Sequence, residues 1–300
     1  MEAVYIIVNL LVFLGLAPLF EGIIRKITAK VQSRQGPPIY QPYMDIFKLL
    51  GKATINSADN WGFKFAPMMA FASIVSVIAF FPLANKANYL TQYADIITII
   101  YLLTLGGIAV LLGALSSKNT YAMIGASREM ITMIMVEPVL AMTLIMGAVK
   151  MKSLGIDITM FSINSVGYGW SVALMLVVYL AALQAFVGRP PFDISEAEIE
   201  ILEGPFIEYS GPNYALFKYY MMLKQMFYAA LFVMVFIPFL NTGIYIVNLA
   251  VQIVEIGVVF GFISLIGSTN ARLRIDQAIK FYSVLIVLAL CAVGLSVYGI

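Results

Sequence analysis

Histidine is absent from this 300-residue sequence, and cysteine occurs once, as Cys291 in an apolar run near the C-terminus. Zinc sites, haem held by histidine, iron–sulfur clusters and histidine-activated nucleophiles all need residues that the chain lacks. One cysteine also excludes an internal disulfide. The net charge of +2 gives no basic field for nucleic acid. Any redox chemistry that this chain serves must therefore take place on a molecule bound to it.

Charged residues are scarce as well. They make up 11% of the sequence, against 62% hydrophobic residues, and the mean hydropathy is +0.94. Soluble domains are about one quarter charged, so this chain has too little polar surface to face water on all sides. The composition therefore predicts an integral membrane protein.

Long apolar runs predict an all-α integral membrane protein with eight transmembrane helices. Each run has about 20 residues, enough to cross a hydrocarbon core of ~30 Å. No internal repeat or low-complexity linker interrupts the chain, so we expect a single membrane domain over residues 1–300. The predicted spans are 3–24, 66–84, 96–115, 127–149, 168–187, 221–240, 245–267 and 280–299.

Lysine and arginine are distributed unequally between the two sides of these spans. Fifteen of the 18 fall in, or just inside, the loops that follow spans 1, 3, 5 and 7, and three fall on the other side. By the positive-inside rule, these four loops are cytoplasmic and both termini lie outside. The predicted cytoplasmic loops are 25–65, 116–127, 188–220 and 268–279.

The first of these loops contains residues 43–50, YMDIFKLL, in which apolar residues recur at helical spacing beside Asp45 and Lys48. This pattern predicts an amphipathic helix that lies at the membrane interface. Loops 25–65 and 188–220 are long, and long loops on one face suggest a docking platform for a soluble partner. The alternative is that they only cap the helix bundle.

Loop 188–220 also holds six acids within sixteen residues: Asp193, Glu196, Glu198, Glu200, Glu203 and Glu208. Only Arg189 lies nearby in sequence to neutralise them, and apolar residues such as Ile194 and Ile201 alternate with them. Crowding and desolvation raise carboxyl pKa values, so we expect this acidic segment to hold exchangeable protons. The alternative is an ordinary solvated acidic loop.

Two further acids fall deep within predicted spans, Glu137 before Pro138 and Glu255, and Glu129 lies two helical turns before Glu137. An ionisable group at such depth costs roughly 2.5–3.5 kcal/mol and usually faces a polar interior. We expect Glu129 and Glu137 to relay a proton or cation, with Glu255 as a further member. The alternative for each is a protonated side chain with a structural hydrogen bond.

These residues lie in motifs that resemble a known family, the eight-helix membrane subunit, often called subunit 1, that joins the redox arm of respiratory complex I to its membrane arm. The acidic segment reads PFDISEAEIEILEGPFIEYSG, and the first loop has Gln32, Arg34, Gly36 and Pro37 before QPYMDIFKLL. The nine-residue offset from Arg128 to Glu137 and the segment RLRIDQ at 272–277 match as well. One position departs from the family pattern: Phe186 stands where complex I has an acid.

The SRQGPP and EGP segments resemble most the membrane-bound nickel–iron hydrogenase branch, followed by the related sulfane reductases. That resemblance implies a non-catalytic membrane anchor and coupling subunit of a ferredoxin-dependent oxidoreductase complex in a prokaryotic plasma membrane. The implied partners are a hydrogenase-like large subunit, an iron–sulfur small subunit and antiporter-like membrane subunits. Iron–sulfur clusters, and a nickel–iron centre in the hydrogenase case, would belong to those partners, and this chain would hold no cofactor.

In that interpretation the acidic segment senses the redox event, and Glu129, Glu137 and Glu255 pass the change of charge into the membrane. The expected docking or charge-pairing residues are Arg34, Arg128, Arg189, Arg272, Arg274 and Asp276. Two alternatives remain: a quinone-reducing complex of the same family, and a stand-alone secondary transporter. The moved ion is H⁺ or Na⁺, and the terminal electron acceptor is a proton, a sulfur compound or a quinone.

Overall fold

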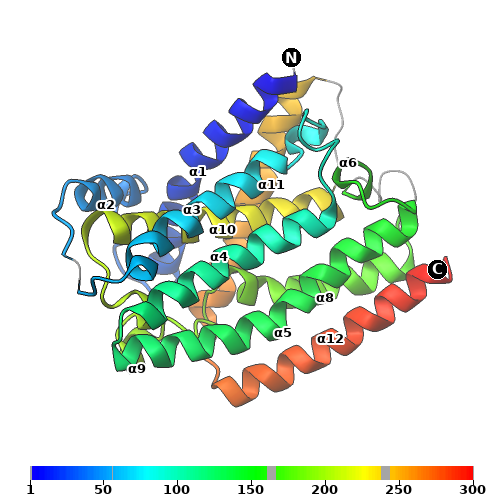
Figure 1. Cartoon of the computed structure of the whole chain (residues 1–300). Helices are drawn as coiled ribbons and strands as arrows, with labels where there is room; N and C mark the ends of the chain where they lie inside the picture. Colours follow the sequence, from blue (N-terminus) through cyan, green and yellow to red (C-terminus); the bar gives the residue numbers. More distant parts are fainter. Residues whose placement is uncertain (1, 56, 161–166, 238–243, 300) are drawn as a thin grey trace.

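The computed structural model describes residues 2–55, 57–160, 167–237 and 244–299, and within them every long element is a helix (Figure 1). Eight of these helices are long and apolar enough to cross a membrane, which confirms the predicted all-α membrane fold. They are α1 (Glu2–Val31), α3 (Trp61–Phe80), α4 (Ile96–Ser116), α5 (Thr120–Met151), α8 (Trp170–Val187), α10 (Gly211–Phe236), α11 (Tyr245–Thr269) and α12 (Ile275–Val297).

Several helices are longer than the predicted spans at the end that carries most of the basic residues. Helix α1 continues to Val31 instead of 24, α5 begins at Thr120 instead of 127, and α10 begins at Gly211 instead of 221. Hydropathy finds only the part of a helix that matches the hydrocarbon core, whereas backbone hydrogen bonding continues into the polar region. Parts of the predicted loops 25–65, 116–127, 188–220 and 268–279 are therefore helical.

Helix α10 lies at the centre of the bundle. Of the eight candidate spans it is the least apolar and the most buried, with 83% of its membrane window enclosed by the protein. It packs against α1, α3, α8 and α11. A helix that is enclosed on all sides needs no polar face toward water, so its polar side chains face the protein interior.

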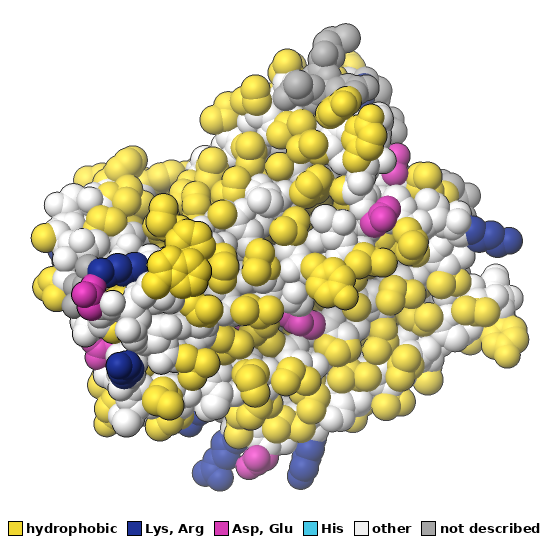
Figure 2. Space-filling view, in the orientation of Figure 1, with side chains coloured by type: hydrophobic (Ala, Val, Ile, Leu, Met, Phe, Trp, Pro, Cys, Tyr) yellow, Lys and Arg dark blue, Asp and Glu magenta, His cyan; other side chains and the backbone are white. Residues whose placement is uncertain are grey.

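The short elements lie at the two ends of the bundle. One end, which we call the loop face, carries α2 (Gln41–Leu50), α9 (Glu198–Ile201) and the 3₁₀ turn η2 (Gly204–Phe206). The opposite end carries η1 (Leu83–Asn85) and α6 (Ile156–Thr159). Apolar side chains cover most of the view in Figure 2, and Lys and Arg gather mainly toward its left and lower edges.

Helix α2 has the amphipathic character that the sequence predicts. Ile46 is buried against the bundle, whereas Met44 and Phe47 are exposed. The acidic residue of the helix, Asp45, pairs with Arg25 of α1 at 3.1 Å. The exposed apolar side chains are consistent with a position at a membrane interface, which stays a prediction.

Candidate functional site: a charged pocket beneath the loop face

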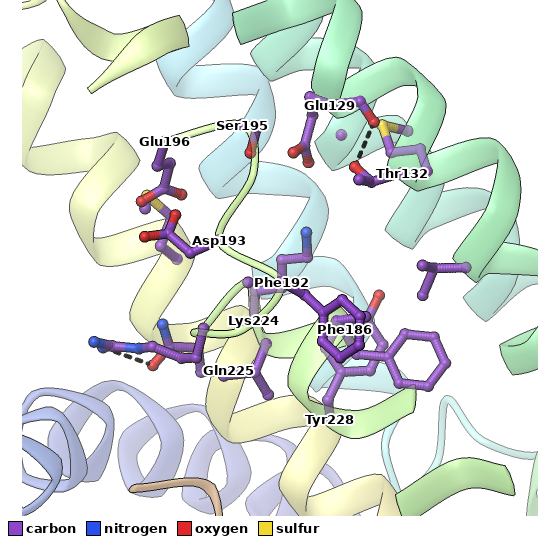
Figure 3. A pocket seen from close by; sticks show the side chains of 18 of the residues that line it. Glu129, Thr132, Phe186, Phe192, Asp193, Ser195, Glu196, Lys224, Gln225 and Tyr228 are labelled. Carbon is purple, nitrogen blue, oxygen red and sulfur yellow. Dashed lines mark hydrogen bonds between the residues drawn. The ribbon is translucent and has the colours of Figure 1, made fainter. Parts of the chain in front are cut away.

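A cavity of about 560 Å³ lies beneath the loop face, between α1, α4, α5, α8, α10 and the segment that follows α8. We call it the charged pocket, because eleven ionisable acids and bases line it. The acids are Glu21, Glu129, Glu137, Asp193, Glu196 and Glu203, and the bases are Arg25, Arg189, Lys218, Lys224 and Arg272. Figure 3 shows Glu129 projecting into this space from one side and Asp193 and Glu196 from the other.

One wall of the pocket is a chain of ion pairs that starts at Glu21 of α1. Glu21 is buried and is paired with both Arg189 and Arg25, the latter at 3.2 Å. Arg25 continues the chain to Asp45 of α2. Arg189 also donates to Gln225 of α10 at 3.3 Å. Arg189, predicted to be a charge-pairing residue, thus fixes the start of the acidic segment against α1 and α10.

Two further arginines predicted to pair charges hold the acidic segment on its other side. Arg272, just before α12, forms an ion pair with Asp193 at 2.8 Å. Arg128 of α5 pairs with Glu200 at 2.8 Å and donates to the carbonyl of Ile194. Charge-assisted bonds of this kind are stronger than neutral hydrogen bonds, so they fix the segment's path over the pocket.

The backbone of the acidic segment turns sharply at Gly204, which has φ +51°. A Cβ atom there would lie 2.1 Å from the carbonyl oxygen of Ser195, so only glycine fits. Gly125 of α5 is similarly close, because a Cβ on it would meet Gly204 and Pro205 within 3 Å. These glycines let the segment pack directly on α5, one helical turn before Glu129.

Glu129 and Glu137 line the same pocket from α5. Eight residues of α-helix separate them, which corresponds to about 12 Å along the axis. Glu129 lies closer to the loop face, where it repels Glu196, and it also repels Glu137. The three carboxylates therefore form a series that leads from the acidic segment toward the middle of α5.

The acids of the segment do not behave alike. Burial raises the pKa of Glu196 to about 8, repulsion from Asp193 and Glu129 adds to this rise, and Arg189 and Lys224 oppose it. The hydrogen bond and charge of Arg128 instead lower the pKa of Glu200. Hydrogen bonds from Ser57 and Asn119 lower the pKa of Glu208. The predicted rise in carboxyl pKa is thus found at Glu196 and is reversed at Glu200 and Glu208.

The remaining acids of the segment have varied surroundings. Glu203 accepts a hydrogen bond from Tyr214 at 2.9 Å and lines the pocket. Glu208 lies away from the pocket lining and accepts from Asn119. The side chain of Glu198 lies outside the described residues.

Other predicted residues do not line the pocket. Glu255 is half-buried on α11. Arg34, Arg274 and Asp276 are exposed on the loop face, where Arg34 donates to Gln32 and Arg274 acts on Glu200 at longer range. These three residues remain candidates for contact with a docked partner.

Sequence reasoning missed Lys224 and Glu21 as members of the site. Lys224 is a lysine inside an apolar helix, and such a residue by itself indicates a functional site. The sequence-based prediction used it only to orient the chain in the membrane. Glu21 precedes Arg25 by four residues, the spacing of a helical ion pair. Phe186, which replaces an acid of the resembled family, is buried in the pocket wall and stacks on Tyr228 with ring centroids 5.0 Å apart.

Comparisons with known proteins agree on one family. The family model described as NADH dehydrogenase matches residues 3–297. Formate hydrogenlyase subunit 4 of Escherichia coli is 33% identical, over 92% of this chain and 92% of that protein. Hydrogenase-4 component C of the same organism is 35% identical, over 90% of this chain and 88% of that protein.

A solved structure is similar over nearly the whole chain as well. It is a chain of the membrane-bound sulfane sulfur reductase, described as an archaeal respiratory membrane complex. The TM-score is 0.82 at 29% sequence identity, and the match covers 97% of this chain and 99% of that one.

Proposed function

The chain belongs to the NADH dehydrogenase family, and on that premise we propose that it is the membrane coupling subunit of a respiratory complex that reduces protons or sulfur compounds. A redox arm docked on the loop face would transfer electrons. This chain would convert that reaction into ion translocation through the carboxylates of the charged pocket. The similarity to subunits of a formate hydrogenlyase and of a sulfane sulfur reductase supports this role.

One observation carries the proposal. The charged pocket brings Glu196 of the loop face together with Glu129 and Glu137 of a helix long enough to cross the membrane. Because the pKa of Glu196 is about 8, this carboxyl exchanges protons near neutral pH. A change of charge in a docked partner therefore has a titratable group to act on just beneath the loop face, and a series of carboxylates behind it.

The partners of the proposal follow from the resemblance of the motifs. They are a hydrogenase-like large subunit and an iron–sulfur small subunit on the loop face, and antiporter-like subunits within the membrane, with ferredoxin as the electron donor. The clusters and the nickel–iron centre would be in those subunits. Exposed Arg34, Arg274 and Asp276 would contact the redox arm.

The unequal distribution of lysine and arginine supports an orientation for this assembly. We place the loop face in the cytoplasm, both termini outside, and the complex in a prokaryotic plasma membrane. Helix α2 would then lie at the cytoplasmic interface, with Met44 and Phe47 among the lipids.

The test uses the assembled complex in sealed membrane vesicles, with electron transfer and ion uptake measured on the same sample. We expect Glu196→Gln and Glu137→Gln to reduce ion uptake at least about tenfold while electron transfer continues, because an amide cannot take part in proton exchange. Asp59→Asn is the control, because Asp59 is exposed and pairs with Lys64 at the surface.

Normal ion uptake in both pocket variants would refute the coupling role and leave the chain as an anchor. Supplying ferredoxin with protons, sulfur compounds or quinones as alternative acceptors identifies the reaction of the redox arm. Co-purification of this chain without other subunits would instead support a stand-alone transporter.

A further inference from the structure

Lys224 projects from α10 into the charged pocket, where it faces groups from every neighbouring wall. In Figure 3 its ammonium group points into the space between Glu129 and the pair Asp193 and Glu196. The ionisable groups around it are Glu21 and Arg25 of α1, Glu129 and Glu137 of α5, Arg189, Asp193, Glu196, Glu203 and Arg272 of the loop face, Tyr214, Lys218, Tyr220 and Tyr228 of α10, and Tyr282 of α12.

Most other cations of the pocket already have partners. Arg25 and Arg189 are held by Glu21, and Arg272 is held by Asp193. Lys218 donates to Tyr214. Lys224 differs from the three arginines, because among the described residues no carboxylate is within ion-pair distance of it.

Lys224 nevertheless interacts with a whole series of carboxylates. It is attracted by Glu129 most strongly, and also by Glu196 and Glu137. One ammonium group can balance one of these charges at a time. Its stem of four methylene groups is flexible, and the cavity of about 560 Å³ gives it room to move.

We propose that Lys224 is the shared counter-ion of Glu196, Glu129 and Glu137, and that its ammonium group moves toward whichever of them is ionised. The proposal rests on the proposed function and names a positioning residue for it. Lys224 keeps its own proton throughout. Its position decides which carboxylate can lose a proton at low cost, so ionisation of Glu196 and of Glu137 becomes mutually exclusive.

The cost of burying an ionised carboxylate explains why a mobile counter-ion is needed. An ionised carboxylate in a poorly solvated cavity is costly unless a cation lies close to it. Fixed arginine pairs cannot follow a charge over the roughly 12 Å that separate Glu129 from Glu137. A mobile ammonium group can reduce the cost at both ends in turn, and a charge change at the loop face is then felt deep in the membrane.

The experiment compares Lys224→Met and Lys224→Arg in the purified, assembled complex. Infrared absorption of the protonated carboxyl group reports the titration of Glu196, assigned as the band that Glu196→Gln removes. Without the ammonium group, Glu196 should stay protonated to a pH higher by about 1 unit. Arginine keeps the charge, so Lys224→Arg should titrate like the wild-type complex.

Lys150→Met is the matched control. Lys150 is half-buried at the other end of α5, away from the pocket, so its removal takes away one charge and should leave the Glu196 titration unchanged. Ion uptake in vesicles is the second readout. Lys224→Met should uncouple uptake from electron transfer, and Lys224→Arg should restore most of the uptake.

An unchanged Glu196 titration in Lys224→Met would overturn the proposal. If that variant fails to assemble, the arginine variant decides. Loss of uptake in an assembled Lys224→Arg complex would also overturn the proposal, because arginine keeps the positive charge. The two proposals fail differently. A wild-type complex that moves no ions refutes the proposed function, whereas the infrared titration tests the interaction of Lys224 with Glu196 by itself.

Discussion

The acidic segment has two parts with opposite environments, although both carry several carboxylates. The inner part, residues 189–196, covers the charged pocket, and the pKa of its Glu196 is raised to about 8. The outer part, residues 200–208, faces away from the pocket at Glu200 and Glu208, whose pKa values are lowered by hydrogen bonds and by Arg128. The density of acids is therefore a poor guide to proton exchange, because burial and partners decide it.

The two parts are also held differently. The inner ion pair joins Arg189 to Glu21, whose side chain is 6% exposed, whereas the outer pair joins Arg128 to Glu200, whose side chain is 54% exposed. Buried charges depend on their partners for solvation, and exposed charges have water as a substitute. Three substitutions test this contrast.

The largest loss of stability is expected for Arg189→Gln. The variant leaves Glu21 buried with Arg25 as its remaining cation and removes the bond to Gln225. We expect a loss of about 3 kcal/mol in the free energy of unfolding, because a buried carboxylate that loses one of its cations is less well compensated. Thermal unfolding of the detergent-solubilised complex measures this, and a midpoint equal to the wild type would contradict the buried role of the pair.

A change in stability that is smaller per pH unit is expected for Glu196→Gln. Between the ordinary carboxyl pKa of 4.5 and the folded value of about 8, the folded protein holds a proton that the unfolded chain has lost. The free energy of unfolding should therefore fall as pH rises through this window, by less than about 1.4 kcal/mol per unit.

Glutamine cannot ionise, so the Glu196→Gln variant should be about as stable as the wild type near pH 4 and increasingly more stable than it toward pH 8. The measurement is the difference between the two unfolding midpoints across that range. A constant difference would mean that Glu196 has an ordinary pKa, and the contrast between the two parts would disappear.

The smallest loss of stability is expected for Arg128→Gln. It removes the exposed pair with Glu200 and a 3.4 Å bond to the carbonyl of Ile194. Exposed pairs contribute about 0–1 kcal/mol, so the loss of stability should lie below about 1 kcal/mol. A loss as large as that of Arg189→Gln would show that the outer part is anchored as strongly as the inner part.

Sequence reasoning predicted the eight-helix fold and the family, and both were confirmed. Runs of apolar residues determine membrane helices directly, and the motifs of the acidic segment are specific. It also singled out Glu129 and Glu137, which line the same pocket. It could not separate Glu196 from Glu200, because their different burial depends on how Gly204 turns the chain against Gly125.

Lys224 and Glu21 were missed for a related reason. Their partners come from distant parts of the chain, such as Arg189 for Glu21, and no local pattern encodes a contact over 168 residues. Phe186 was noticed as a departure, but only the structure places its ring in the pocket wall beside Tyr228.

The enclosed position of α10 has a consequence for biosynthesis. This helix carries Lys224 and Gln225 and is the least apolar of the eight, so it is the one least suited to enter lipid alone. Three of the helices that surround it, α1, α3 and α8, precede it in the chain, and α11 follows it. Because synthesis starts at the N-terminus, most of the helices that contact α10 are made before α10 itself. Its polar side chains can then pack against these helices instead of facing hydrocarbon.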